Sequence, residues 1–405
     1  MIVFDVSRLI TRARQPTPTG IDRVELAYAR HLIAGARRLC FASAASRGGL
    51  ALLPRPLVER YVEAIAALWS EGPSIRRRAR VRWAALCLRF ARIGRRRALG
   101  RRLRAAAERP IYLLVSHHRL EDRRLFAALK SRHGAAFVCL IHDLIPSEFP
   151  EFARPGQGKR HRQRIENAAA LADVLIVPSA ATGAALAPYL ARSASRGRLL
   201  TAQFGVDPPP VAATGPALPE RPYFVCLGTI EARKNHLLLL NLWRDLAGDR
   251  DTAPTLLLIG RRGWEVETAI DMLDRCPALP GLVSEWAALS DSETARLLKH
   301  ARALLLPSFA EGFGFPLIEA LALGVPVLAS DIPVFREIGE GVPEYFHPLD
   351  GAGWRAAILD YARDPSPRRE AQLRRIADWR PPLWDDHFAA VDAMIAELSA
   401  APSRG

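Results

Sequence analysis

The stretch 307–330, PSFAEGFGFPLIEALALGVPVLAS, places two carboxylates and two glycines around the start of a predicted helix. Glu311 precedes this helix and Glu319 lies within it, while Gly312 and Gly314 allow the backbone to approach a ligand closely. The first turn of a helix also presents free N–H groups and the positive end of the helix dipole. Two carboxylates with such amides between them can bracket the two ends of a nucleotide sugar. The simpler interpretation, a Rossmann-type turn with surface glutamates, does not account for the full string.

A second motif, GTIEARKNH, follows the predicted strand Tyr223–Leu227 directly. Its Arg233 and Lys234 lie where a strand ends and a helix begins, which is the edge at which α/β sheets bind ligands. Paired cations at this edge would offset the charge of a departing diphosphate without a metal ion. The alternative is a solvated helix start. Asn235 and His236 are expected to cap or pack the helix.

Two further candidates come from the N-terminal half. His142 stands at the end of an apolar strand in CLIHDLIPSEFPEF, and its position at the edge of a cleft favours a ligand contact over a core role. Gly20, in TGIDRV between the first strand and the first helix, would let the backbone approach a ligand closely. Asp22 is unfavourable beside phosphates unless it points at the acceptor or at Arg23. His117 and His118 receive a structural interpretation.

The elements that must position these residues alternate as strand and helix, which predicts α/β architecture with parallel sheets covered on both faces. We predict a first domain over residues 1–205, a proline-rich linker over 206–222 and a second domain over 223–377. The last segment, 378–405, is predicted to form a helix that crosses back to the first domain. The predicted strands are Ile2–Val6, Ile111–Ser116, Ala136–His142, Val174–Pro178, Tyr223–Leu227, Thr255–Ile259, Ala303–Pro307 and Val325–Ser330.

The EGFGFPLIEA string, with seven residues between its two glutamates, resembles the signature of the family 4 retaining glycosyltransferases (glycosyl transferases group 1). The resemblance implies the GT-B fold, in which two Rossmann-like parallel-sheet domains face a central cleft. It further implies that Glu311 contacts the donor sugar, Glu319 the ribose hydroxyls, and the amides of Phe313–Phe315 the phosphate. By the same resemblance Arg233 and Lys234 would hold the diphosphate and His142 would lie near the donor sugar. Relatives also have a glycine-containing loop at the position of TGIDRV, whose backbone approaches the diphosphate, so the resemblance implies this role for Gly20. Many relatives carry a second glycine where this chain has Asp22.

The net charge of +15 is concentrated in one segment. Residues 72–107 contain thirteen arginines and no acidic residue, which leaves +2 for the rest of the chain. Trp83 and Phe90 recur at helical spacing among Arg82, Arg89 and Arg96, a pattern typical of a helix on an anionic membrane surface. Two alternatives remain open: a solvated basic helix whose apolar stripe packs on its own domain, and a nucleic-acid patch. We do not expect nucleic acid, because no recognised binding motif accompanies the patch.

Other features of the sequence narrow the class of protein. The five cysteines are far apart and indicate reduced thiols rather than a disulfide framework or a metal site. No apolar run approaches the ~20 residues of a membrane-spanning helix, and the first residues lack a cationic leader. We therefore expect a cytoplasmic protein, peripheral to the inner face of the plasma membrane, that needs no cofactor besides its nucleotide-sugar substrate.

Together these features predict a retaining, metal-independent hexosyltransferase. The combination of GTIEARKNH with HDLIPSEFPEF looks most like bacterial mannosyl-type transferases of surface polysaccharide synthesis, so GDP-mannose is the first choice of donor. The acceptor would be a saccharide or a saccharide linked to a polyprenyl diphosphate. The alternatives are a GT-B scaffold or membrane-binding protein without transferase activity, and a GT-B sugar-nucleotide epimerase or phosphorylase.

Overall fold

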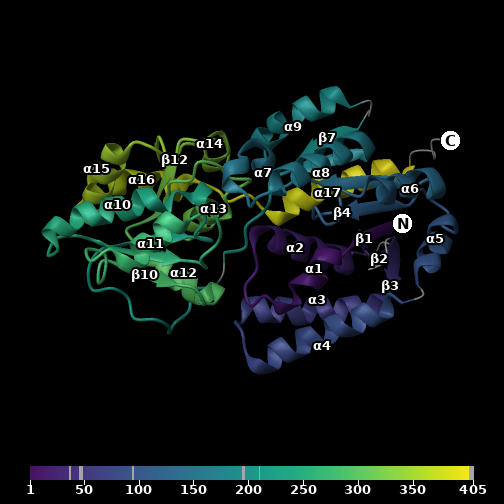
Figure 1. The fold of residues 1–405 in the computed structure, drawn as a ribbon, viewed down its shortest axis with the longest axis horizontal. Helices are drawn as coiled ribbons and strands as arrows, with labels where there is room; N and C mark the ends of the chain where they lie inside the picture. The colour runs from purple at the N-terminus through teal and green to yellow at the C-terminus, as the bar shows by residue number, and fades with distance from the viewer. Residues whose placement is uncertain (36–37, 45–48, 94, 194–196, 209, 401–405) are drawn as a thin grey trace. The chain divides into compact units, whose positions relative to one another are not determined.

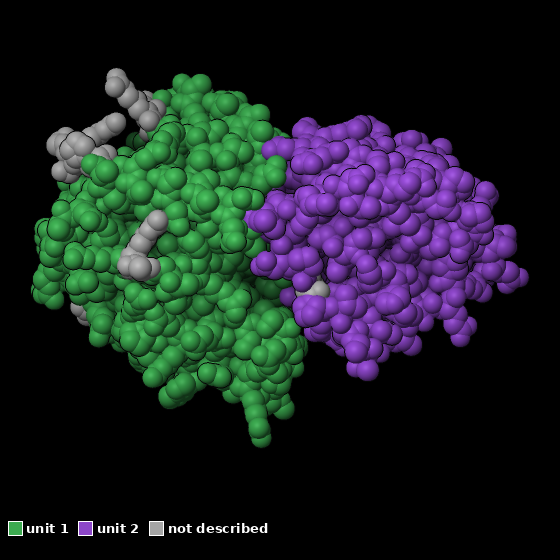
Figure 2. All heavy atoms as spheres, turned by 180° about the vertical axis from the view of Figure 1, so that it is seen from behind, with its two compact units in different colours: residues 1–144, 159–204, 384–405 green, residues 145–158, 205–383 purple. Residues whose placement is uncertain are grey.

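The structure of the protein is a computed structural model that describes residues 1–35, 38–44, 49–93, 95–193, 197–208 and 210–400, without the side chain of Arg96. The chain divides into two compact units (Figure 2). Unit 1 comprises residues 1–144, 159–204 and 384–405, and unit 2 comprises residues 145–158 and 205–383.

Unit 1 is built on a seven-stranded sheet of order β3-β2-β1-β4-β5-β6-β7. Its strands are β1 (Ile2–Asp5), β2 (Leu39–Ala44), β3 (Leu50–Leu53), β4 (Ile111–Leu114), β5 (Ala136–Leu140), β6 (Val174–Val177) and β7 (Arg198–Thr201). Every pairing is parallel except that of β2 with β3, which is antiparallel. The central strands are buried throughout, which agrees with their continuous apolar runs and with helices on both faces.

The helices of unit 1 surround this sheet (Figure 1). They are α1 (Ser7–Thr11), α2 (Gly20–Ala34), α3 (Arg55–Ser70), α4 (Ile75–Ala91), α5 (Arg96–Arg104), α6 (Arg123–His133), α8 (Gln157–Leu171) and α9 (Ala180–Arg192), with a 3-10 turn η1 (Arg12–Arg14). Local sequence fixes several of their starts. Thr19 and Asp22 form a capping box that begins α2, and Ser179 accepts a hydrogen bond from the Thr182 amide at the start of α9.

Unit 2 contains a six-stranded parallel sheet of order β10-β9-β8-β11-β12-β13. The strands are β8 (Tyr223–Leu227), β9 (Thr255–Ile259), β10 (Val283–Trp286), β11 (Ala303–Leu306), β12 (Val327–Ser330) and β13 (Glu344–Phe346). The helices are α7 (Ile145–Glu148), α10 (His236–Leu246), α11 (Glu267–Arg275), α12 (Asp291–Lys299), α13 (Phe315–Ala322), α14 (Pro333–Gly339), α15 (Gly351–Ala362) and α16 (Pro367–Asp378), with 3-10 turns η2 (Pro150–Phe152), η3 (Ala232–Lys234) and η4 (Ala247–Asp249). Both units are therefore Rossmann-like, as the sequence predicts.

The segment 145–158 differs from the predicted domain boundaries, because it packs with unit 2 although the chain on both sides of it belongs to unit 1. Phe152 stacks on Phe309 with ring centroids 5.6 Å apart. The indole N–H of Trp264 donates to the carbonyl of Phe152 at 3.1 Å, and the Arg154 guanidinium lies 5.2 Å from the centre of the Trp264 ring. The prediction of a first domain over residues 1–205 is wrong for this segment, since its aromatic partners come from unit 2.

The last described helix, α17 (Trp384–Ala400), belongs to unit 1, in agreement with the predicted crossing. It begins after Pro381 and Pro382 rather than at residue 378, because the two prolines separate it from α16. His387 Nε2 lies 2.8 Å from the Tyr28 hydroxyl, and the Phe388 ring stacks on His31 at 4.0 Å. In the part of the chain that the structure describes, no helix is both long enough and apolar enough to cross a bilayer.

Candidate functional site

Glu311, Arg233 and Lys234 meet in one buried cluster in unit 2. Glu311 Oε1 lies 2.7 Å from Lys234 Nζ, and Glu311 Oε2 lies 2.5 Å from an Arg233 guanidinium nitrogen. The Ser308 hydroxyl donates to Glu311 Oε1 at 2.9 Å, and Arg233 also pairs with Glu231 at 2.7 Å. The Glu311 side chain is 8% exposed and that of Lys234 9%, so little water screens these charges.

The ends of two neighbouring parallel strands bring this cluster together. Arg233 and Lys234 lie in η3 after β8, and Glu311 follows β11, which pairs with β8. The two loops are joined by the backbone, because the Phe309 amide donates to the Arg233 carbonyl at 2.8 Å. Arg233 returns a bond to the Ala310 carbonyl at 2.8 Å. The cluster therefore occupies the carboxyl edge of the sheet, where ligands of such folds bind.

The charge state of Glu311 follows from these contacts. Burial acts to raise the pKa of its carboxyl group, but the charges of Arg233 and Lys234 outweigh burial and hold that pKa at about 2. Glu311 is therefore an anion at neutral pH. It accepts hydrogen bonds with both oxygens and orients the two cations beside it.

The helix that follows, α13, begins at Phe315 with Gly314 as its N-cap. Gly314 has φ of 98°, and a Cβ atom there would lie 2.8 Å from a ring carbon of Phe335, so no larger residue is accommodated. Pro316 occupies the first turn, where the absent N–H of proline costs no hydrogen bond. Phe313 is buried and its ring packs edge-on against that of Phe315 at 5.3 Å.

The rest of the motif follows the same pattern. Gly312 is half-buried in the turn between Glu311 and α13. Glu319 is a half-buried residue of α13, one turn beyond Phe315. The anionic side chain of Glu311 and the N-terminus of α13 therefore follow closely along the chain at the edge of the sheet.

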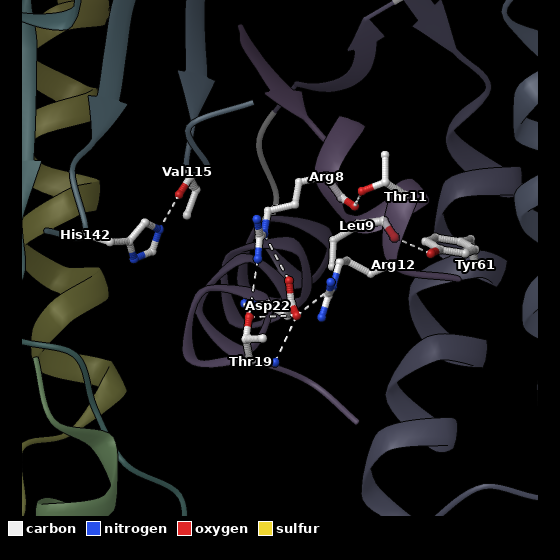
Figure 3. A network of polar contacts seen from close by, with 9 residues as sticks. All are labelled: Arg8, Leu9, Thr11, Arg12, Thr19, Asp22, Tyr61, Val115 and His142. Atoms are coloured by element: carbon white, nitrogen blue, oxygen red, sulfur yellow. Dashed lines mark hydrogen bonds and ion pairs between the residues drawn. The ribbon is translucent and has the colours of Figure 1, made fainter. Parts of the chain in front are cut away.

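His142 lies in unit 1, two residues after the end of β5. It is 5% exposed, and its Nε2 lies 2.7 Å from the Val115 carbonyl (Figure 3). Because a carbonyl can only accept, Nε2 carries the proton and Nδ1 is an acceptor in the neutral ring. Burial lowers the pKa of His142 to about 4, which keeps the ring neutral at pH 7.

Two other histidines surround His142. The His117 ring packs edge-on against it at 5.6 Å, and the His161 ring lies 5.1 Å from His117. His117 Nε2 is placed to accept from the His142 amide at 3.4 Å. The sequence analysis gave His117 a structural role, but the structure places it directly beside the candidate site residue His142. Among the described residues, no group of three or more His, Cys, Asp and Glu side chains is arranged to hold a metal ion.

Asp22 forms ion pairs and hydrogen bonds with other residues of unit 1 (Figure 3). Its fully buried carboxylate pairs with Arg8 at 3.0 Å and with Arg12 at 2.8 Å, and it accepts from the Thr19 amide at 2.9 Å. The sequence suggested the acceptor or Arg23 as its target, but α1 and η1 supply the cations. Gly20 is the first, exposed residue of α2, directly before this network.

The basic segment forms α4 and α5, and the structure decides one of the open alternatives. Trp83 is 69% exposed and Phe90 63% exposed, so the apolar stripe does not pack on its own domain. Arg82 and Arg89 are exposed beside them. Arg96 begins α5, but its side chain lies outside the described residues.

Sequence reasoning missed several partners of the site. Glu231 and Ser308 lie within the two motifs and contact Arg233 and Glu311, and both were visible as polar residues two or three positions away. Arg8 and Arg12 have helical spacing after the first strand, but only the fold shows that both face Asp22.

Residues 215–341 match the family described as "Glycosyl transferases group 1". In sequence the chain is similar to the serotype-specific mannosyltransferase WbdA of Escherichia coli, with 30% identity over 260 residues that cover 59% of this chain and 32% of WbdA. It is also similar to the O-antigen chain mannosyltransferase B of Escherichia coli, with 31% identity over 164 residues, 40% of this chain and 43% of that protein. The matched region thus spans less than half the length of these relatives.

The solved structures that the chain resembles cover the residues of both units. Anabaena HepE in complex with UDP-glucose has a TM-score of 0.65 at 14% identity and covers 98% of this chain and 99% of its own. Sucrose-phosphate synthase from Thermosynechococcus elongatus has a TM-score of 0.61 at 17% identity, with 99% of each chain covered. At these identities the likeness concerns the fold, which is of the GT-B type. The chain therefore has a GT-B-type fold and carries, over residues 215–341, a domain of the glycosyl transferases group 1 family.

Proposed function

We propose that the protein is a retaining glycosyltransferase that moves a hexose from a nucleoside diphosphate donor to a hydroxyl group of an acceptor. The observation that carries this proposal is the buried cluster of Glu311 with Arg233 and Lys234 at the carboxyl edge of the unit 2 sheet, next to the start of α13. A carboxylate, two cations and a helix N-terminus are the groups that a sugar diphosphate requires.

Each group has a role in this proposal. Arg233 and Lys234 bind the diphosphate and stabilise the negative charge that grows on it as the sugar leaves, so that no metal ion is needed. The amides of Phe313 to Phe315 contribute further donors at the start of α13. Glu311 accepts hydrogen bonds from sugar hydroxyls, and Glu319 accepts them from the ribose.

We further propose that His142 contacts the donor sugar and that the backbone at Gly20 contacts the diphosphate. Its neutral ring offers Nδ1 as an acceptor for a sugar hydroxyl, because Nε2 is held by the Val115 carbonyl. In the reaction the bond from the anomeric carbon to the phosphate oxygen breaks, and a bond to the acceptor oxygen forms on the same face. The departing phosphate takes the acceptor's proton. Because the acceptor attacks the face from which the phosphate leaves, the anomeric configuration is kept without a covalent enzyme intermediate.

GDP-mannose is the proposed donor, and the acceptor is a saccharide or a polyprenyl-diphosphate-linked saccharide of bacterial surface polysaccharide synthesis. The relatives described above support this assignment, since their names specify mannosyltransferases and, for one, the O-antigen chain. We propose that the enzyme works in the cytoplasm at the inner face of the plasma membrane, where such acceptors are available.

A thermal-shift panel with UDP, GDP, ADP and their sugar conjugates tests the donor site. A nucleotide at about a hundredfold its dissociation constant stabilises the fold by ~2.7 kcal/mol, so the matching series raises Tm visibly. Glu319→Ala weakens the response, while Glu370→Ala, an exposed glutamate on α16 of the same unit, leaves it unchanged. No response to any nucleotide would contradict the proposal and favour the scaffold alternative.

Turnover is a separate readout. Incubation with labelled GDP-mannose and a mannose-containing acceptor should release GDP and extend the acceptor, and NMR of the product should show the donor's anomeric configuration. Release of an altered sugar nucleotide without acceptor would indicate an epimerase instead.

A further inference from the structure

The helix α4 presents two apolar stripes, of which one is buried and the other is exposed. Val81, Ala85 and Leu88 are buried, and α4 packs through this side against α3. α4 also contacts η1, and Figure 1 shows it at the border of unit 1, next to α3. The opposite side carries a second apolar stripe, whose large side chains are exposed.

This second stripe is long and strongly exposed. Its large members are Ile75 (88% exposed), Trp83 (69%), Leu86 (42%), Phe90 (63%) and, in the turn after the helix, Ile93 (74%). With Ala79 they recur every three or four residues, and at 100° per residue the helical members lie within an arc of about 80°. Scattered exposed apolar residues are ordinary, but a continuous row along one helix marks an interaction surface.

Arginines border this stripe on both sides. By helical geometry Arg82 and Arg89 lie along one edge, and Arg76 and Arg80 along the other. None of these four has an acidic partner among the described residues, whereas Arg77 at the start of the helix pairs with Glu71. The stripe is therefore an apolar row with aromatic rings at its centre and unneutralised cations at its rims.

We propose that this face of α4 docks on an anionic lipid surface, with Trp83 and Phe90 inserted at the level of the headgroups and the rim arginines bound to lipid phosphates. The arrangement matches a helix lying in the membrane plane, because arginine stems can extend along the apolar surface while their charged ends reach the phosphates. The inference stands on α4 alone and does not depend on the proposed reaction.

Charge decides against the other occupants. A second copy of the chain would bring arginine rims against arginine rims in a symmetric contact, since such a contact uses the same patch on both molecules. A nucleic-acid duplex presents its phosphates along the outside and offers no apolar surface to the centre of this stripe. An anionic bilayer offers apolar chains to the centre of the stripe and phosphates to the arginines at its rims.

Vesicle flotation with the full chain tests the proposal. The protein should float with phosphatidylcholine vesicles that contain about 30% of the anionic lipid phosphatidylglycerol. It should float only weakly with vesicles of pure phosphatidylcholine. Arg82→Gln with Arg89→Gln should lower partitioning on the anionic vesicles roughly 25-fold, because each lost charge accounts for about fivefold. Trp83→Ala with Phe90→Ala should lower it by more than about tenfold.

A matched control removes the same net charge elsewhere on unit 1. Arg123→Gln with Arg124→Gln, two exposed arginines of α6, should leave partitioning within about twofold. Unchanged Tm values show that all variants are folded. Equal losses in the control and the α4 charge variant, or no binding to anionic vesicles by the unaltered protein, would overturn the proposal. Two further results, in a protein that does not bind vesicles, would also overturn the proposal. One is self-association that Trp83→Ala with Phe90→Ala abolishes, and the other is DNA binding that Arg82→Gln with Arg89→Gln abolishes.

Discussion

Lys234 extends across the face of Gly228, so that a Cβ atom on residue 228 would lie 2.9 Å from Lys234 Cε and 3.1 Å from its Nζ. Gly228 also has φ of 129°, a conformation that residues with a side chain rarely adopt. The residue directly after β8 is therefore what allows Lys234 to reach Glu311. The position of the Lys234 ammonium group therefore depends on the absence of a side chain at Gly228 as well as on the charge of Glu311.

Gly228→Ala should displace Lys234 and strain the backbone. We expect a loss of about 1–3 kcal/mol in the free energy of unfolding, together with weaker nucleotide binding in the thermal-shift panel. Gly248→Ala is the matched control, because a Cβ atom there would meet nothing within 4 Å. Nucleotide binding by Gly228→Ala equal to that of the unaltered protein would show that Lys234 does not need this position.

Glu311→Gln should destabilise unit 2 by about 3 kcal/mol at pH 7, because it leaves Arg233 and Lys234 without their shared buried anion. Urea unfolding monitored by circular dichroism measures this difference. The folded pKa of about 2 lies below the ordinary value of 4.5, so the stabilising contribution is complete above pH 4.5 and is lost as the pH falls toward 2. The stability gap between the two proteins should therefore narrow below pH 4.5, and a gap independent of pH would contradict the ion-pair account.

His142 should make unit 1 sensitive to mild acid. Its folded pKa of about 4 lies below the ordinary 6.5, so the unfolded chain binds the proton first. The stability from the neutral ring is complete above pH 6.5 and is lost as the pH falls toward 4, which amounts to about 2 kcal/mol at pH 5. His142→Gln should show a smaller drop in unfolding free energy between pH 7 and pH 5, while His300→Gln, an exposed control, should keep the full drop. Identical pH profiles for all three proteins would exclude this role.

Asp22→Asn should weaken unit 1 by about 3 kcal/mol, because the amide cannot neutralise Arg8 and Arg12 in a buried position. Asp122→Asn offers a comparison of the same chemistry at a more exposed helix start, where asparagine caps nearly as well and the expected change is within about 0.5 kcal/mol. Chemical unfolding of both variants at neutral pH provides the measurement. Equal effects at the two positions would mean that the buried ion pairs contribute little.

Local signals accounted for most of the fold. The strands Tyr223–Leu227 and Thr255–Ile259 begin and end where their apolar runs do, and the capping box of Ser290 and Glu293 starts α12. These features depend on neighbours in the sequence. The strand β7 is largely exposed and β3 runs antiparallel to β2, so neither has the buried parallel pattern, and their existence depends on pairing partners.

The candidate site shows the same division. Residue type and position singled out Arg233, Lys234 and Glu311 separately, but their union in one ion-pair cluster requires the neighbouring positions of β8 and β11. Likewise, the partners of Asp22 depended on where η1 places Arg12, which no spacing rule reveals. The exposure of Trp83 required knowledge of which side of α4 packs on α3.

The return of α17 to unit 1 sets the order in which the protein can mature during translation. Tyr28 and His31 leave the ribosome before most of unit 2 is made, but their partners His387, Phe388 and Asp392 follow unit 2 in the sequence. The contacts of α17 with α2 therefore form only after all of unit 2 has been synthesised. A polypeptide that stopped within unit 2 would leave this face of α2 uncovered.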